Sequence, residues 1–583
     1  MEYIISNTSF NKSKQFGYLY FEGPISITNQ ILTLIEGEVY EYDYNVYQKN
    51  SIIKSILESK IPKAVFNLIH YNKTTNVLTI KNDVLGQLPL YIYSYKDTFI
   101  ISNNFWSIIK LLNSRQLSIN KIFLKSLIYL HRIPKEGATF IDNINEIKAA
   151  SYIEIDVLKN KQIKNYIYWD LIHQPDYNLT IDEATFQLDK DIKKQFSIIH
   201  SKYSDKLFAF GNSGGLDSRI IPLYAKEFSI PILGYTIGQI KNNLFLKTAS
   251  FYNAKKIANL LDFNQFDISY YTSNYFNRFL LDIKNNPFGL TQIFKNPYES
   301  IPYFDYLICG GNGFIVANDS GKWINFEKIN RLTEKKEYLF HYISQINRIG
   351  LTSKLSDKLI NRLYSSKNIN SIIRSRKNEF NNLFLEDEIQ EFKYYISEFV
   401  DQNQYKDNIS LIRTFHQKIL NKKSYSGGFE SLNRLKKSFY LYYPYSIENT
   451  LKWPNDFFYQ RRVLINLIQT KYPKLMHIPD QKLQNIDKKK VELLRKVELS
   501  LRKTGINYLD WESASLKNLI HSILEENPDS CFYSIFDKKS IYNLMEKNYY
   551  SPHIYIGLVK VKKMIDIIYN RDFNLLNNNF KIQ

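Results

Sequence analysis

Residues 207–221 read LFAFGNSGGLDSRII, and this stretch decides the fold of the region around it. The apolar run 207–210 has the length of a buried parallel strand, and Gly214 and Gly215 permit a tight turn with positive φ. Residues 219–226 then supply a helical segment. A strand, a glycine loop and a helix start in this order predict one βα unit of a parallel sheet.

The chemistry of this stretch indicates a phosphate site. Backbone N–H groups at a helix start, together with the hydroxyls of Ser213 and Ser218, form an anion nest. Asp217 can hold Mg²⁺ against a pyrophosphate. A Gly-Gly pair alone is weak evidence, and an ordinary tight turn is the alternative reading. The complete string SGGLDS between a strand and a helix is much more specific.

Length, composition and charge limit the function classes. A chain of 583 residues is too long for one core and predicts two or three domains, and 44% hydrophobic residues fit a folded protein. The formal charge of +20 favours nucleic acid or phosphate-rich partners. The basic residues are spread along the chain, however, and the KKK run at 488–490 is typical of a solvated helix face. We therefore expect no specific nucleic-acid partner.

Cysteine usage and the N-terminal sequence bear on the compartment. Cys309 and Cys531 are the only cysteines, which excludes a disulfide scaffold and fits a reducing environment. The first residues lack the pattern of a secretory signal, and no run approaches the ~20 apolar residues of a spanning helix. The sequence predicts a cytoplasmic protein with no membrane partner.

The sequence pattern changes near residue 170. Residues 1–170 contain short β-like runs between turn signals, which predict an antiparallel β-rich domain. Residues 171–583 predict an α/β domain that becomes mainly helical beyond about residue 325. The clearest expected elements are strands at 33–40, 98–102, 230–237 and 306–309, and helices at 181–200 and 251–261.

At these residues the chain resembles the asparagine synthetase family, whose synthetase domain carries an SGGLDS loop behind a β-rich amidotransferase domain. EGEVY at 36–40, DVLG at 83–86, PLY at 89–91 and ISNNFW at 101–106 resemble successive amidotransferase motifs. Further similar segments follow in order and extend the likeness over most of the chain: residues 134–140, 168–169, 442–446, 461–464 and 472–475.

The resemblance implies a fold of two parts. Residues 1–170 would form a β-sandwich of the N-terminal nucleophile hydrolase type, similar to class II glutamine amidotransferases. Residues 171–583 would form a parallel α/β ATP-pyrophosphatase (PP-loop) domain with a helical C-terminal extension. Family members that hydrolyse glutamine use an N-terminal Cys as nucleophile, but Glu2 stands at that place, and Glu36 replaces the oxyanion Asn. We therefore expect an inactive amidotransferase domain without glutaminase activity.

The resemblance also implies the site residues. Lys482 lies near the family's catalytic lysine, which would stabilise charge on the acyl-adenylate. Asn312 replaces a usual acidic residue of the second nucleotide loop, and Asp319 lies a few residues further on. Asp217 would be the Mg²⁺ ligand. The residues assigned to ATP and pyrophosphate are Asn212, Ser213, Gly214, Gly215, Leu216, Asp217, Ser218, Ile237, Gly310 and Gly311.

The implied activity is that of a carbon–nitrogen ligase that uses ATP and Mg²⁺ and forms AMP. A small-molecule or peptide carboxylate is adenylated and joined to an amine, either between molecules or by ring closure as in the family's β-lactam synthetases and lasso-peptide cyclases. Biosynthetic partner proteins are possible in such a pathway. Alternatives are a nucleotide-binding scaffold with a decayed synthetase site, an ammonia-dependent asparagine synthetase-like enzyme and an RNA-acting enzyme of the same loop type.

Overall fold

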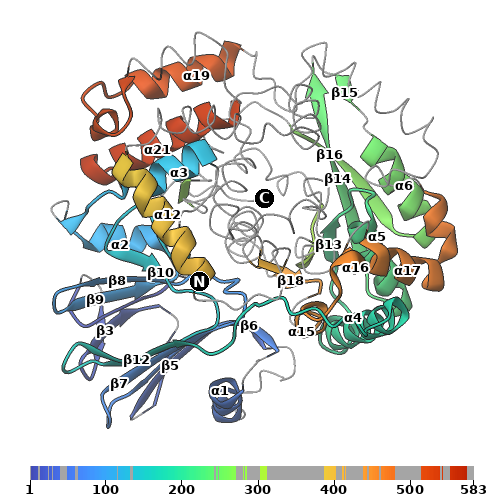
Figure 1. Cartoon of the computed structure of the whole chain (residues 1–583), viewed down its shortest axis with the longest axis horizontal. Helices are drawn as coiled ribbons and strands as arrows, with labels where there is room; N and C mark the ends of the chain where they lie inside the picture. The colour runs from blue at the N-terminus through green and yellow to red at the C-terminus, as the bar shows by residue number, and fades with distance from the viewer. Residues whose placement is uncertain are drawn as a thin grey trace.

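A computed structural model gives the fold. It describes residues 2–10, 13–23, 25–28, 30–39, 49–59, 63–113, 116–130, 135–241, 244–246, 249–270, 280, 283–284, 302–310, 386–401, 410–411, 414, 438–442, 445–458, 461–478, 514–538, 541 and 552–573. Within these residues the chain is an α/β protein with two antiparallel sheets and one mainly parallel sheet. Figure 1 shows the antiparallel sheets at the lower left and the parallel sheet at the right.

The first 167 residues supply the two antiparallel sheets, as the turn-separated β runs predicted. Their inner faces alternate apolar side chains, which meet in one core that includes Ile5, Leu34, Ile80 and Ile101. One sheet has the order β10 (Ile144–Glu146), β8 (Tyr91–Tyr95), β9 (Thr98–Ser102), β1 (Ile4–Ser6), β3 (Leu19–Glu22), β2 (Lys14–Phe16). The other has the order β12 (Lys161–Ile167), β11 (Ser151–Asp156), β7 (Val77–Asn82), β6 (Ala64–Asn72), β5 (Ile31–Val39), β4 (Ser26–Ile27).

The third sheet contains the glycine motif. Four strands run parallel to β13 (Phe208–Gly211) in the order β16 (Asn264–Tyr270), β14 (Ile232–Lys241), β13, β17 (Tyr306–Cys309), β18 (Ser438–Tyr440), and β15 (Leu244–Leu246) adds an antiparallel hairpin to β14. In the register, Ala209 lies between Leu233 of β14 and Leu307 of β17. After β13 the chain adds β14 and β16 on one side of it and then β17 on the other side. In open α/β sheets, ligands bind at the carboxyl ends of the strands at such a reversal of strand order.

The helices beside β13 follow from the sequence. The helix α4 (Ile181–Tyr203) begins with a capping box, in which Thr180 accepts from the Glu183 N–H and Glu183 accepts from the Thr180 N–H. Its buried face repeats at helical spacing through Leu188, Ile192 and Phe196. It packs with α5 (Leu216–Glu227) and α17 (Arg462–Lys471), while α6 (Ala249–Leu261) packs on α5 (Figure 1).

The sequence missed β18. This strand has only three residues, Ser438 to Tyr440, in a region predicted as helical, and such a short run carries no periodicity. Tertiary pairing with β17 creates it. The helix after β13 also begins at Leu216, three residues earlier than expected, because the glycine turn ends at Gly215. The expected strands at 33–40, 98–102, 230–237 and 306–309 and helices at 181–200 and 251–261 are confirmed within two to three residues, apart from the longer β14.

The C-terminal helices share a core with the helices beside the first antiparallel sheet. The buried side chains of α21 (Pro552–Asn570) and α19 (Ala514–Glu525) join those of α2 (Phe105–Leu111) and α3 (Lys121–Leu130). Arg571 donates to the last carbonyls of α2, those of Ile109 and Lys110, each at 3.0 Å. A cation in this position satisfies the carbonyls that a helix end leaves open. The remaining described elements are α1 (Lys49–Glu58), α12 (Glu386–Asp401), α15 (Ile447–Thr450), α16 (Asn455–Phe458) and the 3₁₀ turns η8 (Pro473–His477) and η9 (Cys531–Ser534).

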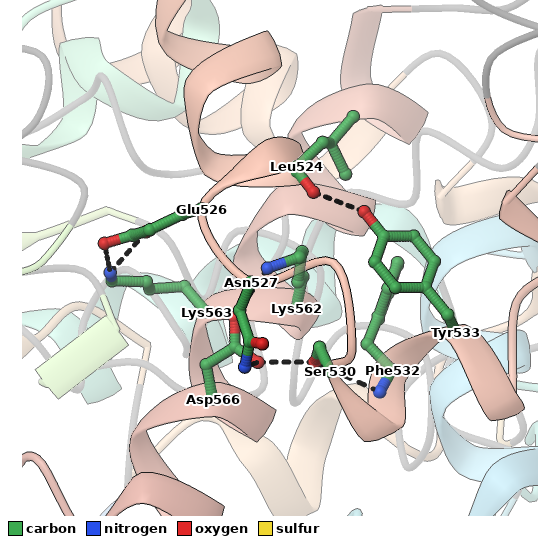
Figure 2. Close-up of polar contacts among 9 residues, drawn as sticks. All are labelled: Leu524, Glu526, Asn527, Ser530, Phe532, Tyr533, Lys562, Lys563 and Asp566. Atoms are coloured by element: carbon green, nitrogen blue, oxygen red, sulfur yellow. Dashed lines mark hydrogen bonds and ion pairs between the residues drawn. The ribbon is translucent and has the colours of Figure 1, made fainter.

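A buried polar cluster joins α21 to the turn before η9 (Figure 2). The Asp566 carboxylate accepts from Lys562 at 2.6 Å, from the Ser530 hydroxyl and from Asn527. Lys562 is fully buried, and Asp566 is 7% exposed. Because the donors come from both α21 and the turn before η9, the carboxylate fixes the turn on the helix.

Candidate functional site

The glycine loop lies at the carboxyl edge of β13. Gly214 has a φ of +72°, a conformation that needs glycine, and Gly215 is the N-cap of α5 with no side-chain cap bond. The first-turn N–H groups of a helix have no partners within the helix. The positive end of α5 therefore lies at this loop, and the anion site that the sequence predicts here stays a prediction.

Asn212 orders the loop from its base. Its side-chain amide donates to the carbonyl of Ala254 at 3.1 Å and to Gln265 at 2.9 Å, and its Oδ1 accepts from the Gly214 N–H at 3.2 Å. Both backbone groups of Asn212 are also engaged, with Tyr235 and Thr236. The structure thus gives Asn212 a loop-ordering role, and its expected backbone contact with a nucleotide stays a prediction.

A neighbouring glycine makes room for this network. A Cβ on Gly234 of β14 would lie 2.4 Å from Oε1 of Gln265 and 2.7 Å from the Phe263 ring. Real Cβ atoms do not approach this closely. Gly234 therefore allows Gln265 to reach Asn212, and the sequence analysis did not identify either Gly234 or Gln265 as part of the site.

The two serines of the loop bond locally. The Ser218 hydroxyl donates to the carbonyl of Gly215 at 2.9 Å and lies 3.4 Å from the Ser213 hydroxyl. Ser213 is exposed at the loop, whereas Ser218 and Leu216 are buried. Ser213 thus remains accessible from solvent, and Ser218 stiffens the start of α5.

Two arginines meet the loop from different sides. Arg219, fully buried on α5, donates to the carbonyl of Gly214 at 3.0 Å and to that of Leu475 at 2.8 Å. Arg461 precedes α17, and its Nη1 lies 3.0 Å from Oδ2 of Asp217. The Arg461 side chain is 7% exposed and that of Asp217 27%. The carboxylate expected to bind Mg²⁺ is thus paired with an arginine from a distant segment.

Tyr442 is a further buried residue of the parallel-sheet region. It follows β18 with a φ of +69° and is fully buried, and its hydroxyl has no hydrogen-bond partner among the described residues. Burial raises the pKa of this hydroxyl well above its usual range; the charge of Asp217 raises it further and that of Arg461 opposes it. The hydroxyl therefore stays protonated and lies in the field of both groups.

The other predicted site residues lie on the same sheet or outside the described residues. Gly310 follows β17, and Ile237 lies in β14, where its backbone pairs with Ile268 of β16. Gly311 and Lys482, and with them Asn312 and Asp319, lie outside the described residues. The structure brings Asn212 through Ser218 to one loop, with Gly310 at the end of β17, the strand beside β13.

The chemistry of a metal site can be tested against these residues. No group of three or more His, Cys, Asp or Glu side chains that could hold a metal occurs in the described part of the chain. A single carboxylate is sufficient for Mg²⁺ when phosphate oxygens and water complete the shell. Asp217, on the first turn of α5, fits this donor set.

The place expected for a glutaminase centre contains a different network. Glu36 accepts from the Tyr3 hydroxyl at 3.0 Å, from Asn67 at 3.0 Å and from Asn103 at 2.8 Å. Burial and the Glu36 carboxylate hold the pKa of Tyr3 far above its usual range, so Tyr3 remains a donor. Glu2 accepts from Asn104 at 2.9 Å and from the Ser107 hydroxyl. Glu2 and Glu36 stand at the positions of the family's nucleophilic Cys and oxyanion Asn, and both carboxylates accept hydrogen bonds from donors within the protein.

Cys309 is not suited to act as a nucleophile. Both cysteines are free, and Cys309 is buried in β17. Burial raises the pKa of the Cys309 thiol to about 12, so that it stays protonated at neutral pH.

Among the described helices, none combines the length with the apolar character that a bilayer crossing requires.

No protein-family model and no curated protein matches the chain. Among solved structures, it is similar to one described as the allosteric regulatory enzyme of purine biosynthesis (10% identity, 40% of this chain and 58% of that one, TM-score 0.19). Others are the glutamine phosphoribosylpyrophosphate amidotransferase of B. subtilis complexed with ADP and GMP (11%, 40% and 58%, TM-score 0.18) and NMN synthetase of Francisella tularensis (18%, 41% and 93%, TM-score 0.16).

The chain spans 58% of the length of the first two of these structures. With TM-scores below 0.2, none of the three likenesses bears on function.

Proposed function

We propose that the protein is an ATP-dependent, AMP-forming amide ligase without glutaminase activity. The observation that carries this proposal is the glycine loop at the start of α5, placed at the switch point between β13 and β17 with the Asp217 carboxylate on its first turn. Sites at this edge of a parallel sheet receive ligands, and helix starts attract phosphate.

The proposed reaction has two steps. A carboxylate oxygen of the substrate attacks the α-phosphorus of ATP, the bond to the bridging oxygen breaks, and pyrophosphate leaves. An amine nitrogen then attacks the acyl carbon, AMP departs with the bonding electrons, and the nitrogen loses a proton. Mg²⁺, held by Asp217 and phosphate oxygens, would offset the charge of the leaving pyrophosphate. The α5 N-terminus would add to this, because its dipoles are oriented before the reaction begins.

The remaining roles rest on the family resemblance. The pyrophosphate would be contacted by Ser213, Gly214, Gly215, Leu216 and Ser218. The adenine nucleotide would be contacted by Asn212 and Ile237. The second nucleotide loop would be formed by Gly310 and Gly311. Lys482 would stabilise charge in the second step. Glu2 and Glu36, bonded to internal donors, support the absence of glutamine hydrolysis. The amine would then come from the substrate itself, from free ammonia or from a partner protein, in a cytoplasmic setting.

The proposal is tested by calorimetry of the full chain with a non-hydrolysable ATP analogue, in Mg²⁺ and in EDTA. We expect Mg²⁺-dependent binding that Asp217→Ala makes independent of Mg²⁺. Carboxylates are then screened for pyrophosphate release. If the chain binds the analogue but none of the carboxylates causes pyrophosphate release, the nucleotide-binding scaffold is favoured. If the chain does not bind the analogue, the ligase is refuted.

A further inference from the structure

Three residues form a closed ring of hydrogen bonds at the base of the glycine loop. The Asn212 side-chain amide donates to Oε1 of Gln265 at 2.9 Å, and Nε2 of Gln265 donates to the Thr236 hydroxyl at 3.0 Å. The Thr236 hydroxyl donates in turn to the backbone carbonyl of Asn212 at 2.6 Å. Each donor in the ring has a fixed acceptor, and hydrogen bonds arranged in this way reinforce one another.

The ring joins three neighbouring strands. Asn212 directly follows β13, Thr236 lies in β14, and Gln265 is the second residue of β16. Gln265 pairs with Gly234 in the register of β14 and β16. A Cβ on Gly234 would lie 2.4 Å from Oε1 of Gln265. The absence of a side chain at 234 therefore leaves the Gln265 amide the room to reach Asn212.

The ring acts on the loop through the other atom of the Asn212 amide. With Nδ2 held by Gln265 and by the carbonyl of Ala254, Oδ1 accepts from the Gly214 N–H at 3.2 Å. The Gly214 carbonyl accepts from Arg219 at 3.0 Å. Side chains from two elements thus hold both polar backbone groups of a glycine whose φ is +72°.

The orientation of Gly214 decides where the next N–H points. In a trans peptide, the carbonyl and the following N–H point in opposite directions. Because the fully buried Arg219 holds the Gly214 carbonyl, the Gly215 N–H is directed away from this guanidinium. That N–H lies 3.4 Å from the hydroxyl of Ser213, an exposed residue. The Gly215 N–H at the start of α5 therefore faces the side from which an anion would approach.

We propose that Gln265 is a positioning residue of the glycine loop, which sets the affinity of the loop for phosphate through Asn212 without touching the phosphate. A loop that already holds its binding shape loses little conformational freedom when a ligand binds. Without Gln265 the Asn212 amide is free to rotate, and the Gly214 N–H loses its fixed acceptor. The identity of the ligand as the pyrophosphate part of ATP rests on the proposed function.

A ring that only stabilises the sheet makes a different prediction. In that case, loss of the Gln265 amide lowers the free energy of unfolding, and the folded variant binds phosphate as well as the unmodified chain does. If Gln265 positions the loop, affinity falls in the folded protein, and the fall requires the Asn212 side chain. The two readings therefore differ in the affinity of folded protein, which a purely structural role would not change.

The test is calorimetry of the full chain with inorganic pyrophosphate in Mg²⁺. Gln265→Met keeps the length of the side chain and removes both polar atoms, and we expect it to weaken pyrophosphate binding about tenfold. Asn212→Ala should weaken binding at least as much. Adding Gln265→Met to Asn212→Ala should then cause almost no further loss, because the residue through which Gln265 acts is already absent.

Gly234→Ala disturbs the ring without changing any of its polar atoms. The new Cβ would displace Oε1 of Gln265, and the Phe263 ring, 2.7 Å from the Cβ, would also have to shift. We expect a loss of pyrophosphate affinity similar to that of Gln265→Met.

Two further variants grade the effect. Thr236→Val removes the hydroxyl but leaves the bond between Gln265 and Asn212, so pyrophosphate binding should weaken less, by about threefold. Gln15→Met is the matched control, because Gln15 is exposed on β2 and donates only to the carbonyl of Gly17 in the described structure. It should leave the affinity unchanged.

The outcomes separate the inference from the proposed function. Unchanged pyrophosphate affinity in folded Gln265→Met, or an equal loss with and without the Asn212 side chain, would overturn the positioning role and leave the ligase standing. Weaker binding by Gln265→Met, in a chain that binds no ATP analogue, would support the positioning role and refute the ligase. An unmodified chain without affinity for pyrophosphate would also overturn the inference, whereas the ATP analogue alone judges the ligase.

Thermal unfolding of each variant identifies those that lose binding through loss of the fold. If Asn212→Ala does not fold, Gly234→Ala and Thr236→Val supply the comparison. Folded Gly234→Ala and Thr236→Val with unchanged pyrophosphate affinity would then overturn the positioning role.

Discussion

Glu36 in the antiparallel sheets and Asp217 at the parallel sheet are two carboxylates with opposite kinds of partner. Glu36 accepts from three neutral donors, Tyr3, Asn67 and Asn103, which come from three parts of the β-sandwich. Asp217 pairs with the Arg461 guanidinium and lies on the first turn of α5, where a helix attracts anions. We therefore propose a structural role for Glu36 and a functional one for Asp217.

The largest expected effect is on catalysis at Asp217. Asp217→Ala should lower carboxylate-dependent exchange of pyrophosphate into ATP by about a thousandfold, equivalent to about 4 kcal/mol, because the charge on the leaving group loses its metal. The free energy of unfolding, measured by urea denaturation, should fall by a smaller amount, because the Asp217 side chain is 27% exposed, although the Arg461 side chain, only 7% exposed, loses this partner. An equal loss of stability and activity would contradict the comparison.

Asp566 is intermediate between Glu36 and Asp217, because its carboxylate accepts from one cation and from two neutral donors. Its partners are Lys562, Ser530 and Asn527, and the Lys562 side chain is fully buried. Asp566→Ala should lower the free energy of unfolding by about 3 kcal/mol, because it leaves a buried ammonium without a counter-ion. Urea denaturation measures the change. Asp572→Ala, at an exposed position just beyond α21, is the matched control and should have almost no effect.

Glu36 should affect stability alone. Glu36→Ala removes the acceptor of three donors and should lower the free energy of unfolding by about 2 kcal/mol. Glu58→Ala is the control, since the Glu58 side chain is 67% exposed and pairs only with Lys54 in the described structure. Binding of the ATP analogue should be the same in both variants. Loss of that binding in folded Glu36→Ala would show that Glu36 also has a functional role.

The smallest expected effect concerns a buried cation, Lys81. Its ammonium donates to the carbonyls of Ile56, Leu57 and Ser59, and burial lowers its pKa to about 8. Between about pH 8 and 10 the unfolded chain therefore binds more protons at this site than the folded one, so this group makes the folded state more stable as pH rises.

The measurement is the difference in free energy of unfolding between the unmodified chain and Lys81→Met. Across this pH range the difference should move by about 1 kcal/mol in favour of the unmodified chain, since the three carbonyls offset part of the effect of burial. A difference that stays constant with pH would show that the carbonyls hold the proton on Lys81 in the folded state.

Much of the fold follows from local patterns. The capping box at Thr180 sets the start of α4, the apolar run of β13 and the two glycines set the loop, and short β-like runs between turn signals set β5 and β9. These signals lie within one element, so a single sequence contains them completely. The division at residue 170 and the roles of Ile237, Gly311 and Lys482 remain predictions.

The sequence by itself determined that a glycine loop follows a buried strand, that Asp217 stands on the next helix, and that no cysteine occupies position 2. Only the tertiary structure decided that β18 joins the sheet, that Arg461 pairs with Asp217, and that the Tyr442 side chain is fully buried. The physical reason is the separation along the sequence of the residues that interact. Turns, caps and periodicity depend on neighbouring residues, whereas the pairing of charges from distant segments depends on how packed helices bring their ends together.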